Sequence, residues 1–456
     1  MIKKGDPTVL GTERIRKLLP NYTLPSIIAM TAVSLYNVVD SIFIGQGCGP
    51  LAIAGLAVSF PLMNLSAAFG AMVGVGSSTV IGVKMGQKDY AGAESVLGHV
   101  VMLNVAIGAL FMIACLTFLD PILMFFGASE ETLPYAHDYM QTLLYGNILT
   151  HLYLGLNDAI RATGYPKRAM MATLTAVVIN ILFNYIFILK MNLGIKGAAM
   201  GTLCAQFVAF SMNVFHFSRK STFLRFKRRV FRLRRHYTKS VLGIGMSSFF
   251  ANSCACLVVL LINNGLKNYG GDLYVGAYGI SNRIAMIFVM IVMGLNQGAQ
   301  PIISYNYGAG NFERFIKTFK LGAMVATAIT TCAFLVGEFC PRVVVKLFTT
   351  DEELIEYSCR ALRIMVCVFP LVGFQMMSIG FFTTIGKAKK AIFLSLTRQL
   401  VFLVPLLIFI PMFMGTDGVW ISMPISDFIS VLTTGALVYL QIRTFKRHPE
   451  TLQPKL

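Results

Sequence analysis

Charged residues are scarce in this chain of 456 residues. They make up 13% of it, whereas soluble globular proteins carry roughly 25%. Hydrophobic residues account for 56%, and the mean hydropathy is +0.69. The apolar residues form repeated runs of about twenty residues or more, which is the length that a helix needs to cross a bilayer. The composition therefore excludes an ordinary soluble protein and predicts a polytopic membrane protein.

Motifs for metal binding and catalysis are also missing. The nine cysteines form no CxxC pair, the histidines form no HExxH, and no nucleophile motif accompanies them. Most of the cysteines lie inside apolar runs, which is typical of small residues packed between helices. The sequence predicts neither an enzyme nor a metal site, and no cofactor.

Twelve membrane spans are predicted between charged or turn-rich breaks, giving an all-α fold. They cover residues 21–45, 51–82, 94–119, 135–160, 168–189, 197–218, 240–265, 274–304, 318–337, 358–384, 391–412 and 418–442. Basic loops alternate with short or acidic ones, so the basic side is expected to be cytoplasmic. Both termini then lie in the cytoplasm, which requires an even number of spans.

The connection between the sixth and seventh spans, residues 219–239, is the most basic one, with ten Lys or Arg and no acid. Such a cluster could be a nucleic-acid or nuclear-targeting patch. Its position directly between two spans favours an orientation signal that also contacts anionic lipid head groups. We therefore expect membrane lipids, and no nucleic acid, among the partners.

The chain repeats itself after 222 residues. This shift lays residues 128–135 (ASEETLPY) on residues 350–357 (TDEELIEY), Gly76 on Gly298 and Gly86 on Gly308. We expect two pseudo-symmetric six-helix lobes, 21–218 and 240–442, joined by the linker 219–239. Segments 1–20 and 443–456 are then a cytoplasmic N-terminal segment and tail. An internal repeat of this kind is typical of secondary transporters.

Asp40 is a carboxylate inside the first apolar run, about five residues, or roughly 7 Å, from its far end. An acid at membrane depth costs roughly 2.5 to 3.5 kcal/mol, so it indicates a functional site. The alternative is an acid that reaches the interface or hydrogen-bonds a neighbouring helix. Pro25, near the other end of the same run, removes a backbone hydrogen bond and could let the helix bend.

Polar residues inside the other spans of the first lobe are candidates for a substrate cavity, because lipid offers them no hydrogen-bond partner. Together with those beside Asp40, they are Tyr36, Asn37, Tyr139, Asn157, Asn180, Asn184, Thr202 and Gln206.

In the second lobe, the rival acid is Asp427, which Arg283 or Arg398 could neutralise. A structural ion pair is the favoured interpretation of Asp427. Under the 222-residue shift Asp40 falls on Ile262, so the two lobes share a scaffold but differ in chemistry.

Five motifs, in order along the chain, resemble the multidrug and toxic compound extrusion (MATE) transporters. They are Tyr36-Asn-Val-Val-Asp40-Ser-Ile-Phe-Ile-Gly45, Leu51-Ala-Ile-Ala-Gly-Leu56, Arg161-Ala-Thr-Gly-Tyr-Pro-Lys167, Ala277-Tyr-Gly-Ile280 and Gln300-Pro-Ile-Ile-Ser-Tyr-Asn-Tyr-Gly-Ala-Gly310. The resemblance implies two lobes in a V shape that open alternately to the two sides of the membrane. It also implies efflux of organic, often cationic, compounds against an inward flow of H⁺ or Na⁺.

The resemblance is to the prokaryotic branch in which the first-helix acid, here Asp40, is the proposed coupling residue. In that branch an asparagine and an acid four residues later on the fifth helix join the site. This chain has Asn180 but Asn184 in place of the acid. Another branch uses acids on helices seven and ten for a cation site, and none lies in 240–265 or in the apolar part of 358–384. A second-lobe Na⁺ site of that type is not expected.

The sequence therefore predicts a monomeric multidrug efflux antiporter of a prokaryotic plasma membrane, coupled to H⁺ with Na⁺ as the alternative. A buried carboxylate needs a proton or a nearby cation, so a proton and a cationic drug would compete for Asp40. A flippase for lipid-linked oligosaccharides, of a related fold, is the rival. It should need a cationic cavity for pyrophosphate, whereas the cavity candidates here are neutral groups and one acid.

Overall fold

The computed structural model describes residues 8–219, 222–227 and 231–447. Parts of the expected N-terminal segment 1–20, basic linker 219–239 and tail 443–456 therefore lie outside the described residues. Over the described ranges every regular element is a helix, as the apolar runs predict. The limits of the segments and lobes remain a prediction.

In the first half of the chain, the described residues fold into nine α-helices and one π-helical segment. They are α1 (Val9–Thr12), α2 (Ile15–Cys48), α3 (Pro50–Gly86), α4 (Tyr90–Thr117), α5 (Leu119–Phe125), α6 (Leu133–Tyr145), α7 (Asn147–Ala162), α8 (Pro166–Asn184), the π-helix η1 (Tyr185–Lys190) and α9 (Gly194–Ser218).

In the second half, nine further α-helices and one more π-helical segment occur among the residues that the structure describes. They are α10 (Arg235–Gly270), α11 (Asp272–Gly308), α12 (Phe312–Phe339), α13 (Pro341–Val345), α14 (Glu352–Val366), α15 (Phe369–Thr384), α16 (Ala388–Leu396), the π-helix η3 (Thr397–Leu403), α17 (Val404–Phe409) and α18 (Pro411–Arg447).

Among the described residues, 10 helices are long and apolar enough to cross a membrane, or up to 11 if α14 and α15, which are bent by 53°, form one span. The remaining expected span, 135–160, is divided at Gly146 into α6 and α7. Two helices also extend beyond the predicted spans. α3 continues to Gly86, past the predicted end at residue 82, and α11 continues to Gly308, past the predicted end at residue 304.

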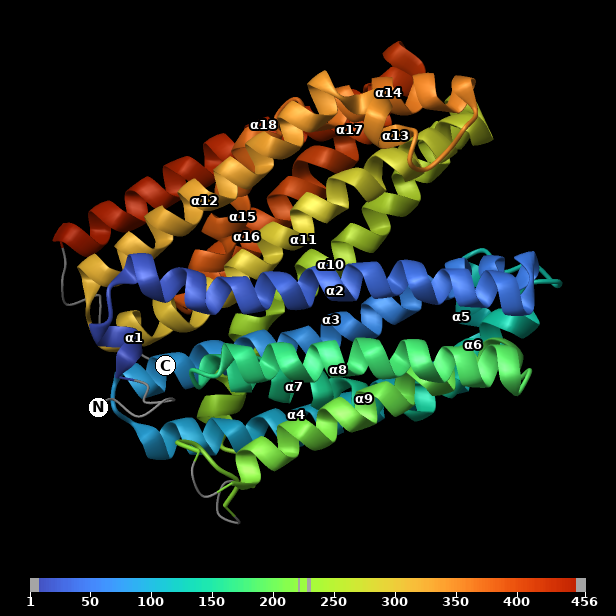
Figure 1. Cartoon of the computed structure of the whole chain (residues 1–456). Helices are drawn as coiled ribbons and strands as arrows, with labels where there is room; N and C mark the ends of the chain where they lie inside the picture. The colour runs from blue at the N-terminus through green and yellow to red at the C-terminus, as the bar shows by residue number, and fades with distance from the viewer. Residues whose placement is uncertain (1–7, 220–221, 228–230, 448–456) are drawn as a thin grey trace.

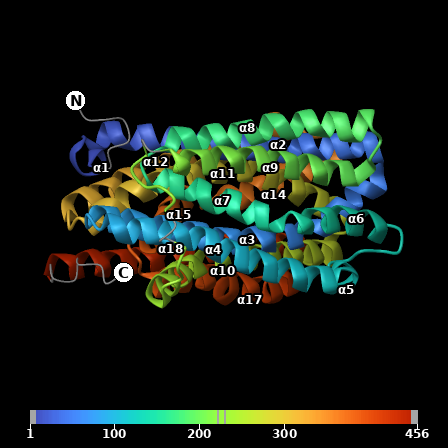
Figure 2. The same cartoon turned by 90° about the horizontal axis from the view of Figure 1, so that it is seen from below.

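The helices form two bundles, α2–α9 and α10–α18, and α1 lies at the same end of the molecule as the C-terminal end of α18 (Figure 1). The view from below shows the same placement of these two helix ends (Figure 2). We call this end, where the described helices begin and finish, the terminus-bearing end. The opposite end carries the tight turns at Gly49 and Gly271, whose φ angles of 85° and 78° are easily adopted only by glycine. These two glycines are 222 residues apart, as the repeat predicts.

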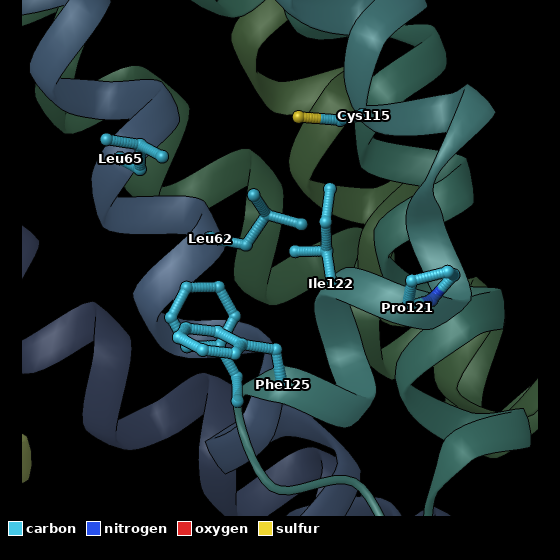
Figure 3. A pocket seen from close by; sticks show the side chains of 7 residues that line it. Leu62, Leu65, Cys115, Pro121, Ile122 and Phe125 are labelled. Carbon is cyan, nitrogen blue, oxygen red and sulfur yellow. The ribbon is translucent and has the colours of Figure 1, made fainter.

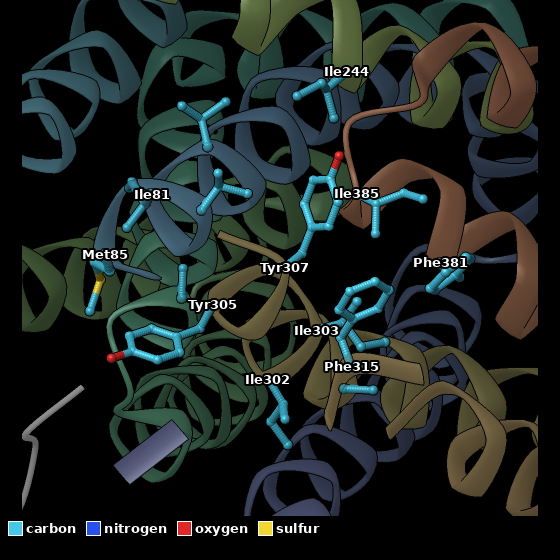
Figure 4. Packing of buried hydrophobic residues seen from close by; sticks show 14 of the residues in the cluster. Ile81, Met85, Ile244, Ile302, Ile303, Tyr305, Tyr307, Phe315, Phe381 and Ile385 are labelled. Carbon is cyan, nitrogen blue, oxygen red and sulfur yellow. The ribbon is translucent and has the colours of Figure 1, made fainter. Parts of the chain in front are cut away.

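One apolar cluster crosses from bundle to bundle at the terminus-bearing end. It includes Ile81 and Met85 of α3, Ile244 of α10 and Tyr305 of α11, all of which are labelled in Figure 4, where Ile81, Met85 and Tyr305 lie nearest one another. Toward the opposite end the clusters are separate: one lies within α2–α9, and two lie within α10–α18. The bundles are therefore joined at one end and diverge toward the other, which gives the V shape seen in Figure 1.

Glycines allow the close approach of the bundles at the joined end. A Cβ on Gly298 of α11 would collide with the backbone of α2 at Thr23, and a Cβ on Gly76 of α3 would collide with α10 at Val241 and approach the backbone of Gly245. Gly298 is the repeat counterpart of Gly76, and Gly245 is that of Thr23. The α2–α11 and α3–α10 contacts are thus equivalent under the 222-residue shift.

Candidate functional site

Asp40 lies on α2, about two turns before the helix ends at Cys48. Its side chain turns into the first bundle, and the residue is only 6% exposed. One carboxylate oxygen accepts a hydrogen bond of 2.6 Å from Asn184 Nδ2 on α8. No ion pair with Asp40 occurs within the described part of the chain. The carboxylate is therefore buried with a neutral donor as its partner.

A chain of neutral polar groups continues from Asp40 along the inner faces of α8 and α9. Asn184 Nδ2 also donates to Asn180 Oδ1 at 2.7 Å, and Asn180 Nδ2 donates to Thr202 Oγ1 at 3.0 Å. The Tyr36 hydroxyl lies 3.2 Å from Thr202 Oγ1. Tyr36 and Asp40, like Asn180 and Asn184, are four residues apart, so each pair shares one helix face. The structure thus brings Asp40 and four of the predicted cavity residues into one network.

The end of α8 is shaped by the π-helix η1, which begins at Tyr185 directly after Asn184. Such widened turns often occur at functional sites. Asn184 Oδ1 is buried and has no hydrogen-bond partner among the described residues. A buried oxygen without a partner carries an energetic cost, which a proton on Asp40 or a small cation beside it would relieve.

The other predicted cavity residues lie apart from this chain of hydrogen bonds. Tyr139 is buried and near enough to Asp40 and Tyr36 to interact with both electrostatically. Asn37 is exposed. Asn157 donates to Thr173 at 2.8 Å, and Gln206 accepts from Thr150 at 2.5 Å.

Pro25 is buried within α2, which continues as a helix on both sides of it. It lies between Thr23 and Ile27, the residues that face Gly298 and Gly294 of α11. Pro25, where the sequence predicts that the helix could bend, therefore lies where the two bundles meet.

The sequence analysis did not predict a largely buried ion pair in α7, although Arg161 begins one of the five motifs. Arg161 donates to the Asp158 carboxylate, and the side chains are 11% and 15% exposed. Asp158 also faces Gly74 of α3. Opposite charges three residues apart on one helix were the available signal.

In the second bundle, Arg398 Nε donates to Asp427 Oδ1 at 2.7 Å. The favoured interpretation of Asp427 as part of an ion pair is therefore correct, with Arg398 as the partner. Arg283 is exposed on α11 and makes no ion pair or hydrogen bond with any described residue.

An apolar pocket of about 360 Å³ lies between α3, α4 and α5 (Figure 3). Leu62, Ile122 and Phe125 line it together with Cys115, and no charged side chain does. It therefore offers no electrostatic attraction for an ion, and the candidate site is at Asp40.

Known proteins resemble this chain over nearly its whole length. The protein is 27% identical to the multidrug export protein MepA of Staphylococcus haemolyticus over 425 residues, which is 93% of each chain. The structure matches that of the MATE multidrug transporter DinF-BH, solved as a complex with a ligand, with a TM-score of 0.87 at 34% identity, covering 94% of this chain and 96% of the other.

A second solved structure is titled as the outward-facing conformation of a multidrug resistance MATE family transporter of the MOP superfamily. The TM-score is 0.92 at 25% identity, with 98% of this chain and 99% of the other covered. The two-lobe helical layout is thus that of known MATE transporters. The profile described as MatE matches residues 25–186 and 244–409, and the chain belongs to this family of membrane transporters.

Proposed function

We propose that this protein is a multidrug efflux antiporter that exports organic, often cationic, compounds in exchange for inward H⁺, with Asp40 as the coupling residue. The observation that carries this proposal is the state of Asp40: it is buried, its hydrogen-bond donor Asn184 is neutral, and no cation compensates it among the described residues. A carboxylate in this environment can be compensated by a proton or by a cationic substrate, but not fully by both.

The arrangement of the bundles supports alternating access. The bundles are joined at the terminus-bearing end, which the positive-inside rule assigns to the cytoplasm, and separate toward the other end. Asp40 is eight residues from the end of α2 at that open side, or roughly 12 Å along the helix. A proton arriving from outside would reach Asp40 in this conformation.

The exchange follows from the competition at Asp40. A substrate cation enters from the cytoplasm while the carboxylate is ionised, and protonation from outside then releases it. Asn184 orients the carboxylate, and Asn180, Thr202 and Tyr36 continue the chain of polar groups that begins there. Na⁺ is the alternative ion, for which the Asp40 and Asn184 oxygens are suitable ligands. The protein works as a monomer among the lipids of a prokaryotic plasma membrane and uses no bound cofactor.

The test is transport by the purified protein in vesicles with an imposed pH gradient. The wild type should drive uptake of ethidium, and Asp40→Asn should lower the initial rate at least about tenfold, as expected for loss of a buried charged contact. The matched control is Asp138→Asn, which makes the same chemical change at an exposed ion pair with Lys196 in the same bundle.

Uptake that survives Asp40→Asn would remove Asp40 from the coupling mechanism. A wild-type rate that follows a Na⁺ gradient and ignores the pH gradient would replace H⁺ by Na⁺. Translocation of lipid-linked oligosaccharides without any ethidium transport would favour the flippase.

A further inference from the structure

The first described helix, α1, is a single turn of four residues, Val9–Thr12. A helix this short is not stable in isolation, so its contacts with the rest of the chain hold it in place. Leu10 is 0% exposed and belongs to the apolar cluster that crosses from bundle to bundle. A Cβ on Gly11 would lie 3.0 Å from the ring of Tyr305 on α11. The turn is therefore packed against the end of α11.

Polar side chains of the second bundle hold the backbone of α1. Asn306 of α11 donates through Nδ2 to the Leu10 carbonyl at 2.9 Å. Arg314 of α12 donates through Nη2 to the carbonyls of Leu10 and Glu13, at 3.3 and 2.7 Å. Arg314 Nε also donates to Asn306 Oδ1 at 3.1 Å, which orients both side chains. The last carbonyls of a helix lack partners within it, and here an amide and a cation bind carbonyls at the end of α1.

These contacts tie the two bundles together, because α1 continues into α2 of the first bundle after a break at Arg14 (Figure 1). The end of α11 that holds α1 also contacts α3. A Cβ on Gly86 would collide with the carbonyl oxygen of Tyr305, and a Cβ on Gly308 would collide with the backbone of Val83. The contacts of α1 therefore lie beside the seam between α3 and α11, at the terminus-bearing end.

We propose that α1 is a latch that fastens the first bundle to the second and detaches from α11 and α12 when the terminus-bearing end opens. Alternating access requires the α3–α11 seam to part, which also moves the start of α2 away from α11. The hydrogen bonds of Asn306 and Arg314 and the packing of Leu10 stabilise the conformation that is closed at this end. Loosening them raises the population of the conformation that is open there. This inference rests on the alternating access of the proposed function and adds a device that sets its balance.

The test is hydrogen–deuterium exchange, read by mass spectrometry, of the purified full-length protein in lipid nanodiscs without substrate. Exchange of buried amides follows the population of the open state. Arg314→Gln removes the charge-assisted hydrogen bonds to α1. It should speed exchange in residues 78–86 of α3 and 302–308 of α11 about tenfold. Leu10→Ser removes the apolar contact and leaves the long helices unaltered, so it should act in the same direction.

Lys320→Gln is the matched control, because it removes an exposed cation from α12, the helix that carries Arg314. It should leave exchange at the seam as in the wild type. Residues 133–145 of α6, in the half of the first bundle away from the seam, should exchange at the wild-type rate in every variant.

Unchanged exchange at the seam, faster exchange confined to residues 8–13, an equal effect of Lys320→Gln, or faster exchange in α6 as well would each overturn the latch. The vesicle assay separates this inference from the efflux function. If the expected exchange pattern is found but the wild type transports no ethidium, the efflux function fails and the latch stands.

Discussion

Each of the two bundles holds a carboxylate within the same kind of helical scaffold, but the partner of the carboxylate is neutral in one bundle and cationic in the other. Asp40 in the first bundle has an amide donor from Asn184 and no counter-ion among the described residues. Asp427 in the second bundle is held by the guanidinium of Arg398. Both lie beside a helix that contains a π-helical segment, η1 in the first bundle and η3 in the second.

The repeat shows that neither arrangement is copied from the other. Under the 222-residue shift Asp40 corresponds to Ile262, Asp427 to Ala205 and Arg398 to Ala176. The helical frame is therefore separable from the polar groups that it carries. A carboxylate with a built-in cation cannot exchange partners at low cost, whereas one with neutral partners can. The difference supports the proposal that Asp40, and not Asp427, is the coupling residue.

The largest effect on this comparison is expected from breaking the Asp427 pair. Arg398→Met should lower the free energy of unfolding by about 2 to 4 kcal/mol, because it leaves a buried carboxylate without its counter-ion, although Arg398 itself is partly exposed. Denaturant unfolding in detergent measures the loss. The double variant Arg398→Met with Asp427→Leu should recover most of it. Equal destabilisation of the single and double variants would show that the pair does not act as a unit.

The next largest effect, also on stability, is expected at the glycines through which the two bundles contact each other. Gly76→Ala and Gly298→Ala each add a Cβ against the backbone of the other bundle and should cost about 1 to 3 kcal/mol of stability. Their costs should be similar, because the two contacts are equivalent. Gly279→Ala on α11 is the control, since a Cβ there meets nothing within 4 Å. A large cost at one position alone would contradict the equivalence.

The smallest effect should come from Asn184→Ala, which removes the amide that orients Asp40. We expect the Kd of an organic cation to rise roughly fivefold, as one net hydrogen bond predicts. Titration of the purified protein with a fluorescent cation measures it. Asn157→Ala serves as the control, since Asn157 bonds Thr173 and not Asp40. A larger loss of cation affinity in Asn157→Ala than in Asn184→Ala would indicate that the cation binds near α7 and not beside Asp40.

Much of the fold could be predicted because its signals are local. The scarcity of charge and the length of the apolar runs indicate membrane helices, and the shift of 222 residues indicates two equivalent halves. The division of residues 135–160 at Gly146 could not be predicted, since a run of apolar residues does not show where a helix breaks. The turn glycines Gly49 and Gly271 support the repeat at positions that were not used to detect it.

The site was predictable only in part, because hydrogen-bond partners depend on how helices pack. The spacing of Asn180 and Asn184 shows that they share a face, but not that this face meets Asp40. Gln206 has the same chemistry and bonds Thr150 instead. The choice of Arg398 over Arg283 as the partner of Asp427 likewise depends on tertiary packing, which a single sequence does not show.

The contact between Gln300 and Ser78 lies where the two halves of the chain meet their own repeat. Gln300 Nε2 donates to Ser78 Oγ at 2.9 Å, and the two positions are 222 residues apart. A position that touches its own counterpart lies on a twofold axis, as in the interface of two identical subunits. The contact is the one that two identical six-helix subunits would form across such an axis, but here the two sides are different residues, as a single chain allows.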